Sequence, residues 1–308
     1  MIDSTRDHFP ISQKLNILLF VLMTAALWGL LWTASHVSLL WALLAAVLFA
    51  HLNNGVFSLM HEAVHGLFSN NSAINNLFGI AAAALFPTSF TLQRIAHLGH
   101  HRRNRTDQEL YDYYLPGQSR LLRNFQLYAG NLFGLYWLCI PLSNLIYLLT
   151  PWLYTSRWFI RGPARHLGFE PYVKDIAQQG IWTIWLECLW ALVYQLGIWV
   201  MLDLNWQGWL LCYGFFALHW SVLQYADHAW SARDVVNGAW NLKTTALARI
   251  LALNYHYHLA HHQYPDVPWL HLPRLVENAQ DQPSFWKIYF SLLGGVKPAP
   301  PMGSKATL

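Results

Sequence analysis

Four long apolar stretches are the clearest pattern in the sequence. A helix needs roughly 20 apolar residues to cross the hydrocarbon core of a bilayer, and the stretches 15–34, 38–60, 181–202 and 206–226 meet this length. The connections inside each pair are short: Ser35-His36-Val37 in the first and Asp203-Leu204-Asn205 in the second. The pattern predicts an all-α integral membrane protein with four transmembrane helices in two hairpins.

The basic residues set the expected orientation of these helices. The chain has 19 Lys and Arg residues, and neither hairpin connection holds one. Because basic segments tend to stay on the cytoplasmic side of a membrane, we expect both termini and the segments 61–180 and 227–308 to be cytoplasmic. With no internal repeat or Gly/Ser linker, we expect one domain over residues 1–308 with a cytoplasmic cap.

Two further apolar stretches lie between the hairpins. Residues 77–90 are too few to cross a bilayer, whereas residues 125–152 are enough. If 125–152 crossed once, the basic residues after it would lie on the side opposite to all the others: Arg157, Arg161, Arg165 and Lys174. We therefore predict a re-entrant or interfacial helix, broken near Gly130, Gly134 and Pro141.

Composition supports the membrane assignment and excludes other classes. Only 11% of the residues are charged, against about a quarter in ordinary soluble domains. The net charge is +4 with no Lys/Arg-rich run, so we predict no nucleic-acid partner. The three cysteines stand singly without CxxC spacing, which argues against a disulfide framework or a thiolate metal site.

Histidines supply the candidate chemistry. Eight of the 16 lie in three clusters: His61-x-x-x-His65, His97-x-x-His100-His101 and His258-x-x-His261-His262. Spacings of three and four residues put side chains on one face of a helix, so each cluster can direct several imidazoles to one point. Imidazole binds iron, zinc, copper and nickel, and eight ligands are about twice what one ion needs. The clusters predict a site for two metal ions at the cytoplasmic border.

The order and spacing of the clusters resemble the membrane fatty-acid desaturase superfamily, which also includes hydroxylases and carotenoid ketolases. The last cluster runs into Pro265 and Pro268-Trp269, similar to the turn after the last histidine box of desaturases. Acyl-CoA desaturases carry a further histidine in an NxxxH pattern before that box. The matching place, 30 residues before His258, reads Gln224-Tyr-Ala-Asp-His228. The resemblance implies His228 as a ninth ligand, with Gln224 in place of asparagine.

The resemblance also implies an activity. A desaturase-like enzyme holds two iron ions, uses O2 as co-substrate and acts on a fatty acyl or other lipid chain. Electrons would come from an external ferredoxin, rubredoxin or cytochrome b5-like donor, since no haem, flavin or cysteine-rich motif is present. A basic face could receive such a donor or hold lipid headgroups; its candidates are Arg94, Arg102, Arg103, Arg105, Arg120 and Arg123.

Several side chains are candidates to orient the histidine rings or to line a tunnel. A ligating imidazole usually donates its second N–H to a polar neighbour. The candidates for this contact are Asp227 and Asn254, which adjoin ligand segments, and Glu62, Gln224, Asp107 and Asp112. Candidates to line an acyl tunnel among the four spans are Trp182, Trp185, Trp190, Tyr194, Tyr213, Phe215, Phe216 and Trp220. Glu187 and His219 are ionisable at membrane depth, which suggests either a functional role or hydrogen bonds within the bundle.

Competing interpretations remain open at this stage. Within the superfamily, desaturation is favoured by the third cluster, and the alternatives are hydroxylation or ketolation of a lipid or carotenoid and oxidative decarboxylation to a terminal alkene. Residues 61–65 also fit HExxH, the signature of a zinc protease with Glu62 as general base. A metal carrier or channel is a third class, but it would need ionisable residues across the spans rather than at one border.

Overall fold

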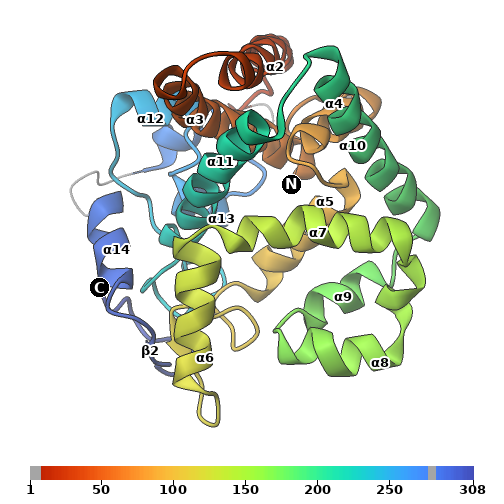
Figure 1. Ribbon diagram of the computed structural model, residues 1–308. Helices are drawn as coiled ribbons and strands as arrows, with labels where there is room; N and C mark the ends of the chain where they lie inside the picture. The colour runs from red at the N-terminus through yellow and green to blue at the C-terminus, as the bar shows by residue number, and fades with distance from the viewer. Residues whose placement is uncertain (1–7, 277–281) are drawn as a thin grey trace.

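The computed structural model describes residues 8–276 and 282–308, and in these ranges almost all of the regular secondary structure is helical. The exception is a parallel pair of two-residue strands, in which β1 (Tyr113–Tyr114) lies beside β2 (Lys297–Pro298). The all-α prediction is confirmed. Figure 1 shows the long helices α2, α3 and α11 packed together, with the shorter elements arranged around them.

All four predicted spans form helices. They are α2 (Gln13–His36), α3 (Leu39–Val64), α10 (Ile181–Met201) and α11 (Trp206–Ala226). The first three are long and apolar enough to cross a membrane. The fourth, α11, is not among them by that measure, and it carries the polar side chains His219, Ser221 and Gln224. It packs against both α2 and α3.

The two hairpin connections meet at the same end of the bundle. The side chain of Asn205, in the second connection, donates a hydrogen bond to the carbonyl of Ser35 in the first. Asn205 also caps α11 by accepting a hydrogen bond from the N–H of Gly208. The two connections without Lys or Arg therefore lie next to each other in space.

Two pairs of helices are bent at a short break. The first pair is α4 (Ser72–Leu85) and α5 (Phe90–Arg103), at 96° to each other. The second begins with α6 (Arg120–Phe125), continues as the π-helical η1 (Gln126–Leu132) and turns by 84° into α7 (Leu135–Leu149). This turn is the near-perpendicular corner between α6 and α7 in Figure 1.

The break before α7 lies at one of the three predicted positions. Gly134 has φ of +83°, which glycine adopts without strain. A side chain there would also run into the backbone of Ala217 and Leu218 on α11. The predicted breaks at Gly130 and Pro141 were wrong: η1 continues through the first and α7 through the second. The helix α7 continues through Pro141 although a proline inside a helix removes one hydrogen bond and crowds the carbonyl four residues earlier.

Side chains from the second hairpin satisfy the backbone at the break between α4 and α5. Gln195 Nε2 donates to the Ala84 carbonyl at 2.8 Å, and the Tyr213 hydroxyl donates to the Leu85 carbonyl at 3.0 Å. The Glu187 carboxylate accepts hydrogen bonds from the Ser89 hydroxyl at 2.6 Å and the Thr91 N–H at 2.7 Å. Broken helices are tolerated at membrane depth only when their backbone groups are paired in this way.

The two ionisable residues predicted at membrane depth both have partners inside the bundle. Glu187 is buried and caps the start of α5. His219 on α11 bonds with Asn54 on α3, and its ring packs edge-on against His51.

Short helices complete the cap of the molecule. They are η2 (Pro151–Thr155), α8 (Arg157–Phe159), η3 (Ile160–Ala164), α9 (Glu170–Ile176), α12 (Ala246–Leu251), α13 (His258–Gln263), η4 (Leu272–Leu275) and α14 (Phe285–Leu292). In Figure 1, α8 and α9 lie below α7 and α14 lies on the opposite side. This arrangement places α5 and α13, which hold the second and third histidine clusters, against the end of α3, which holds the first.

Candidate metal centre

All nine predicted histidines converge on one region, where they form two groups. The first group is His61, His65, His97 and His261, and the second is His100, His228, His258 and His262. Within each group the candidate ligand atoms lie within 4.8 Å of one another. His101 joins the first group, because its Nε2 is 2.9 Å from that of His97 and 3.0 Å from that of His261.

The spacing of the HxxHH clusters explains how each one serves both groups. On α5, His97 and His101 are four residues apart and face the first group, while His100 faces the second. On α13 the assignment is reversed, since His258 and His262 face the second group and His261 the first. Residues four apart lie above one another on a helix, so each motif gives a pair to one group and a single ring to the other.

The nitrogen positions fit metal ions. Neighbouring Nε2 atoms are 2.9 Å apart between His65 and His97 and 3.2 Å apart between His100 and His228. A metal–imidazole bond is about 2.0–2.1 Å long, which holds adjacent ligands on one ion at about this separation. The buried Nε2 of His61 has no hydrogen-bond partner in the described parts of the chain. A centre of neutral nitrogen donors suits iron or another ion of that class.

Burial keeps the imidazoles in the form that binds metal. Loss of hydration lowers the pKa values of His228, His258, His261 and His262 well below the usual value of about 6.5, and the neighbouring histidines lower them further. A neutral ring has a free lone pair, whereas a protonated ring has none. Neutral rings at this site can therefore act as metal ligands near neutral pH.

Two contacts orient rings of the second group. His100 Nδ1 donates to Glu109 Oε2 at 2.9 Å, and His228 Nδ1 donates to the Gly238 carbonyl at 2.8 Å. In both rings this leaves Nε2 to face the other histidines. Sequence reasoning did not find Glu109. The chain between His100 and Glu109 completes α5 and then turns, and the geometry of this turn carries no simple sequence signal.

Three of the residues predicted to orient rings have other hydrogen bonds, and a fourth has none among the residues described. Glu62 accepts from the Trp269 N–H at 3.1 Å, and its nearest approach to His61 Nδ1 is 4.0 Å. Asn254 donates to the Trp269 carbonyl, and Gln224 accepts from the Tyr255 hydroxyl at 2.8 Å. Asp227 is fully buried, and its carboxylate oxygens find no hydrogen-bond partner among the residues described.

A buried ion pair joins the second histidine segment to the chain around His228. Asp112 accepts hydrogen bonds from Arg105 Nη1 at 2.9 Å, from the Tyr225 hydroxyl at 2.8 Å and from the Trp230 N–H at 2.7 Å. Both charged side chains are inaccessible, with 1% of Arg105 and none of Asp112 exposed. Arg105 therefore cannot belong to a basic face open to an electron donor. Asp107, which was also predicted to orient a histidine ring, pairs with Arg233 and is 65% exposed.

A cavity of about 410 Å³ adjoins the centre. It touches the rings of His61, His97, His100, His228 and His258, and it extends past α7 to the segment 167–173. Of the eight aromatic residues predicted to line a tunnel, only Trp220 lines this cavity. Trp182, for example, is 75% exposed on the outside of the bundle. The prediction placed the tunnel among the four spans. Two of them, α3 and α11, do line the cavity, but α5, α7 and the segment 167–173 line it as well.

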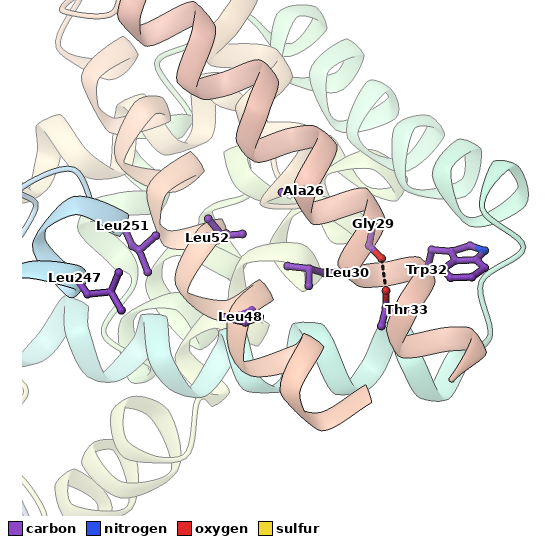
Figure 2. Close-up of a pocket in the computed structure, with 9 residues that line it drawn as sticks. All are labelled: Ala26, Gly29, Leu30, Trp32, Thr33, Leu48, Leu52, Leu247 and Leu251. Carbon is purple, nitrogen blue, oxygen red and sulfur yellow. Dashed lines mark hydrogen bonds between the residues drawn. The ribbon is translucent and has the colours of Figure 1, made fainter. Parts of the chain in front are cut away.

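A second hollow, of about 570 Å³, lies on the outside of the bundle between α2, α3 and α12. Figure 2 shows that its lining is aliphatic apart from Trp32 and the hydroxyl of Thr33, which bonds to the carbonyl of Gly29 in its own helix. It has no metal-binding or titratable side chain, so it is not a candidate for the chemistry.

Comparison with known proteins agrees with the geometry. The family described as fatty acid desaturase matches residues 38–291, a range that contains all nine histidines. Among curated proteins, none matches the chain. Since the match covers most of the sequence, the chain belongs to the fatty acid desaturase family.

Proposed function

We propose that this protein is a membrane-bound, O2-dependent di-iron oxidoreductase that inserts a C=C bond into a fatty acyl or related lipid chain. The observation that carries the proposal is the pair of histidine groups at the end of one cavity. Family membership supports a desaturase-type enzyme. The third-cluster segment, which most resembles desaturases, favours desaturation over hydroxylation, ketolation or decarboxylation.

The nine histidines would hold two iron ions, with His61, His65, His97, His101 and His261 around one, and His100, His228, His258 and His262 around the other. When bound, such a pair with O2 and external electrons supplies the oxidising power to remove hydrogen from an unactivated CH2 group. The protein's part is to orient the rings. Glu109 and the Gly238 carbonyl do so by accepting the Nδ1 protons of His100 and His228.

Aromatic side chains would hold the substrate carbon and exclude water. Tyr255 contacts a ring of each group, with centroid distances of 5.3 Å to His61 and 5.1 Å to His258. Phe57 packs 5.6 Å from Tyr255 and 5.4 Å from Trp220, and all three side chains line the cavity. A dry wall on this side protects a reactive centre from side reactions with water.

The proposal includes a membrane placement. The helices α2, α3, α10 and α11 would cross the bilayer, with both termini and the metal centre on the cytoplasmic side. The end of the bundle without Lys or Arg, where Asn205 contacts Ser35, would face the opposite side. The positive-inside rule and the absence of Lys and Arg from both connections support this orientation.

The zinc-protease alternative explains less of the molecule. It would use His61 and His65 with Glu62 as base. In the structure these two histidines share their group with His97 and His261, and Glu62 accepts a hydrogen bond from the Trp269 backbone. One zinc would leave the second group of four histidines without a function.

The test is expression in a host of defined lipid composition, followed by analysis of lipids and headspace. A new double bond that depends on O2 supports the proposal. New hydroxyl or keto groups, or a volatile alkene, would assign another reaction of the superfamily.

Metal analysis of the same preparations tests the centre itself. We expect two irons per chain and a lower iron content for His228→Ala. The matched control is His166→Ala, which changes an exposed histidine bonded only to the Gly162 carbonyl of its own helical segment. One zinc per chain with peptidase activity would reject the di-iron assignment.

A further inference from the structure

The helix α7 exposes a continuous stripe of leucines. Its members recur at spacings of three and four residues and are 44–63% exposed: Leu135, Leu138, Leu142, Leu145 and Leu149. Spacings of this kind put all of them on one face of the helix. An uncovered apolar face of this length on a chain of this family indicates contact with lipid.

The residues that follow α7 are those expected where hydrocarbon meets headgroups. Trp152 and Trp158 are 64% and 70% exposed. Arg157, Arg161 and Arg165 are also exposed and lie in the same segment. Tryptophan is enriched at the membrane–water boundary, and arginine pairs there with lipid phosphates. The charge and aromatic content of this segment therefore identify the bilayer, rather than water, as the medium over the leucine stripe.

The cavity next to the metal centre reaches the surface along this helix. Most residues that line it are buried or partly buried, but five are exposed: Gln108, Cys139, Leu142, Leu167 and Gly168. Leu142 belongs both to the leucine stripe and to the cavity wall. Cys139 lies one turn before it on α7. The opening thus has an apolar side made by Cys139, Leu142 and Leu167, next to the lipid-facing surface.

An aromatic wall connects this opening with the histidines. Tyr136 on α7 stacks on Trp220 at a centroid distance of 5.6 Å, and Trp220 packs 5.4 Å from Phe57. Phe57 in turn contacts Tyr255, which lies against His61 and His258. All four aromatic side chains line the cavity, so one apolar path leads from α7 to both histidine groups.

We propose that this opening is a lateral portal, through which a single-chain lipid passes from the bilayer directly into the cavity without crossing water. The portal is defined by Cys139, Leu142 and Leu167. This inference rests on the proposed function for the identity of the substrate. The physical reason is that an apolar chain is hydrated unfavourably, and an opening within the lipid-facing surface removes that step. The substrate class is thus a chain already dissolved in the membrane.

Cys139 provides a probe for the portal. It is exposed, whereas Cys188 and Cys212 are buried with no accessible surface. We suggest labelling Cys139 with a bimane fluorophore in the iron-loaded, full-length protein, reconstituted into vesicles of phosphatidylcholine and phosphatidylglycerol. Lipids with a nitroxide on the acyl chain should quench the fluorophore strongly, and aqueous iodide should not. The Lys174 side chain is 57% exposed beside the basic segment, so a fluorophore on Lys174→Cys in a Cys139→Ser background should give the reverse result.

If iodide quenches the Cys139 fluorophore as strongly as the fluorophore on Lys174→Cys, the opening faces water. That result would overturn the portal. This measurement needs no turnover. It therefore separates the two hypotheses: a protein that oxidises no lipid would reject the proposed function, while the quenching would still decide which medium the opening faces.

Turnover tests the route itself. Labelled Cys139 should give a several-fold lower initial rate with a membrane-dissolved substrate at unchanged iron content. The matched control is a label on Leu149→Cys in a Cys139→Ser background; Leu149 lies on the same stripe but does not line the cavity, so its label should leave the rate of that background unchanged. As a second variant, Leu142→Trp changes an exposed position and should raise KM several-fold with kcat retained. Unchanged rates for both the Cys139 label and Leu142→Trp would reject the portal.

Discussion

The carboxylate of Asp112 binds three separate segments together, so its replacement by asparagine should be among the most damaging single changes outside the histidines. It accepts hydrogen bonds from Arg105, from the Tyr225 hydroxyl on α11 and from the Trp230 N–H. Asparagine has nearly the same shape but no charge. The change therefore removes the charge and one of the two acceptor oxygens, and it leaves the packing volume almost unchanged.

The size of the effect follows from burial. The side chain of Asp112 is not exposed and that of Arg105 is only 1% exposed. Asp112→Asn therefore leaves a guanidinium charge buried without a counter-charge. Breaking a buried pair in this way costs about 3–5 kcal/mol. For a chain of this size each kcal/mol lowers the melting temperature by roughly 2–4 °C, so we expect a drop of roughly 10 °C. Because Trp230 lies two residues after His228, iron at the second group should be lost first.

Thermal unfolding of the iron-loaded protein in detergent, combined with iron analysis, measures both effects. The matched control is Glu170→Gln, which also neutralises a paired carboxylate. The partners of Glu170 are exposed, Lys174 by 57% and Arg165 by 72%. Exposed pairs contribute only about 0–1 kcal/mol, so this control should melt close to the wild type. If Asp112→Asn melts with the control and retains two irons, the buried pair does not stabilise the centre.

Three further changes test other parts of the structure. Glu109→Ala should weaken metal binding at the second group by about 10–100-fold, because His100 loses its hydrogen-bond acceptor. Titration with limiting iron should then give one tightly bound ion, and two tight sites would contradict the assignment. Glu187→Ala leaves the Thr91 N–H unpaired at the start of α5 and should destabilise the fold by about 1–3 kcal/mol. The stability of Glu187→Gln should lie between those of Glu187→Ala and the wild type, and equal melting temperatures for the three proteins would count against the cap. Gly134→Ala should strongly destabilise the fold, because Gly134 has a positive φ and lies against the backbone of α11, whereas Gly130 has open space around it and Gly130→Ala should be neutral. Similar yields of folded protein from both variants would refute this interpretation.

The long helices and the histidine groups could be predicted because both depend on local sequence. The stretch 206–226 is helical over its predicted length, and the stretch 15–34 forms Gln13–His36. The length of an apolar run and the helical repeat decide these features. The same repeat decides which rings can share a metal, as His97 and His101 do on α5.

The features that could not be predicted depend on contacts between distant segments. Arg105 looked like a surface residue next to other arginines, but Asp112 and the chain after His228 enclose it. The cavity wall was missed because the 84° turn at Gly134 directs α7 back over the cap. No local pattern specifies which partner meets a charged side chain, or which helix closes a cavity.

The break between α4 and α5 has a consequence for biosynthesis. Its carbonyls at Ala84 and Leu85 are satisfied by Gln195 and Tyr213, which the ribosome adds more than 100 residues later. In the proposed membrane placement, this break has unpaired backbone groups that hydrocarbon cannot solvate until the second hairpin is inserted. The segment with the second histidine cluster must therefore wait in contact with water or the insertion machinery. Maturation of the centre, including iron loading, is thus expected only after the whole chain has been made.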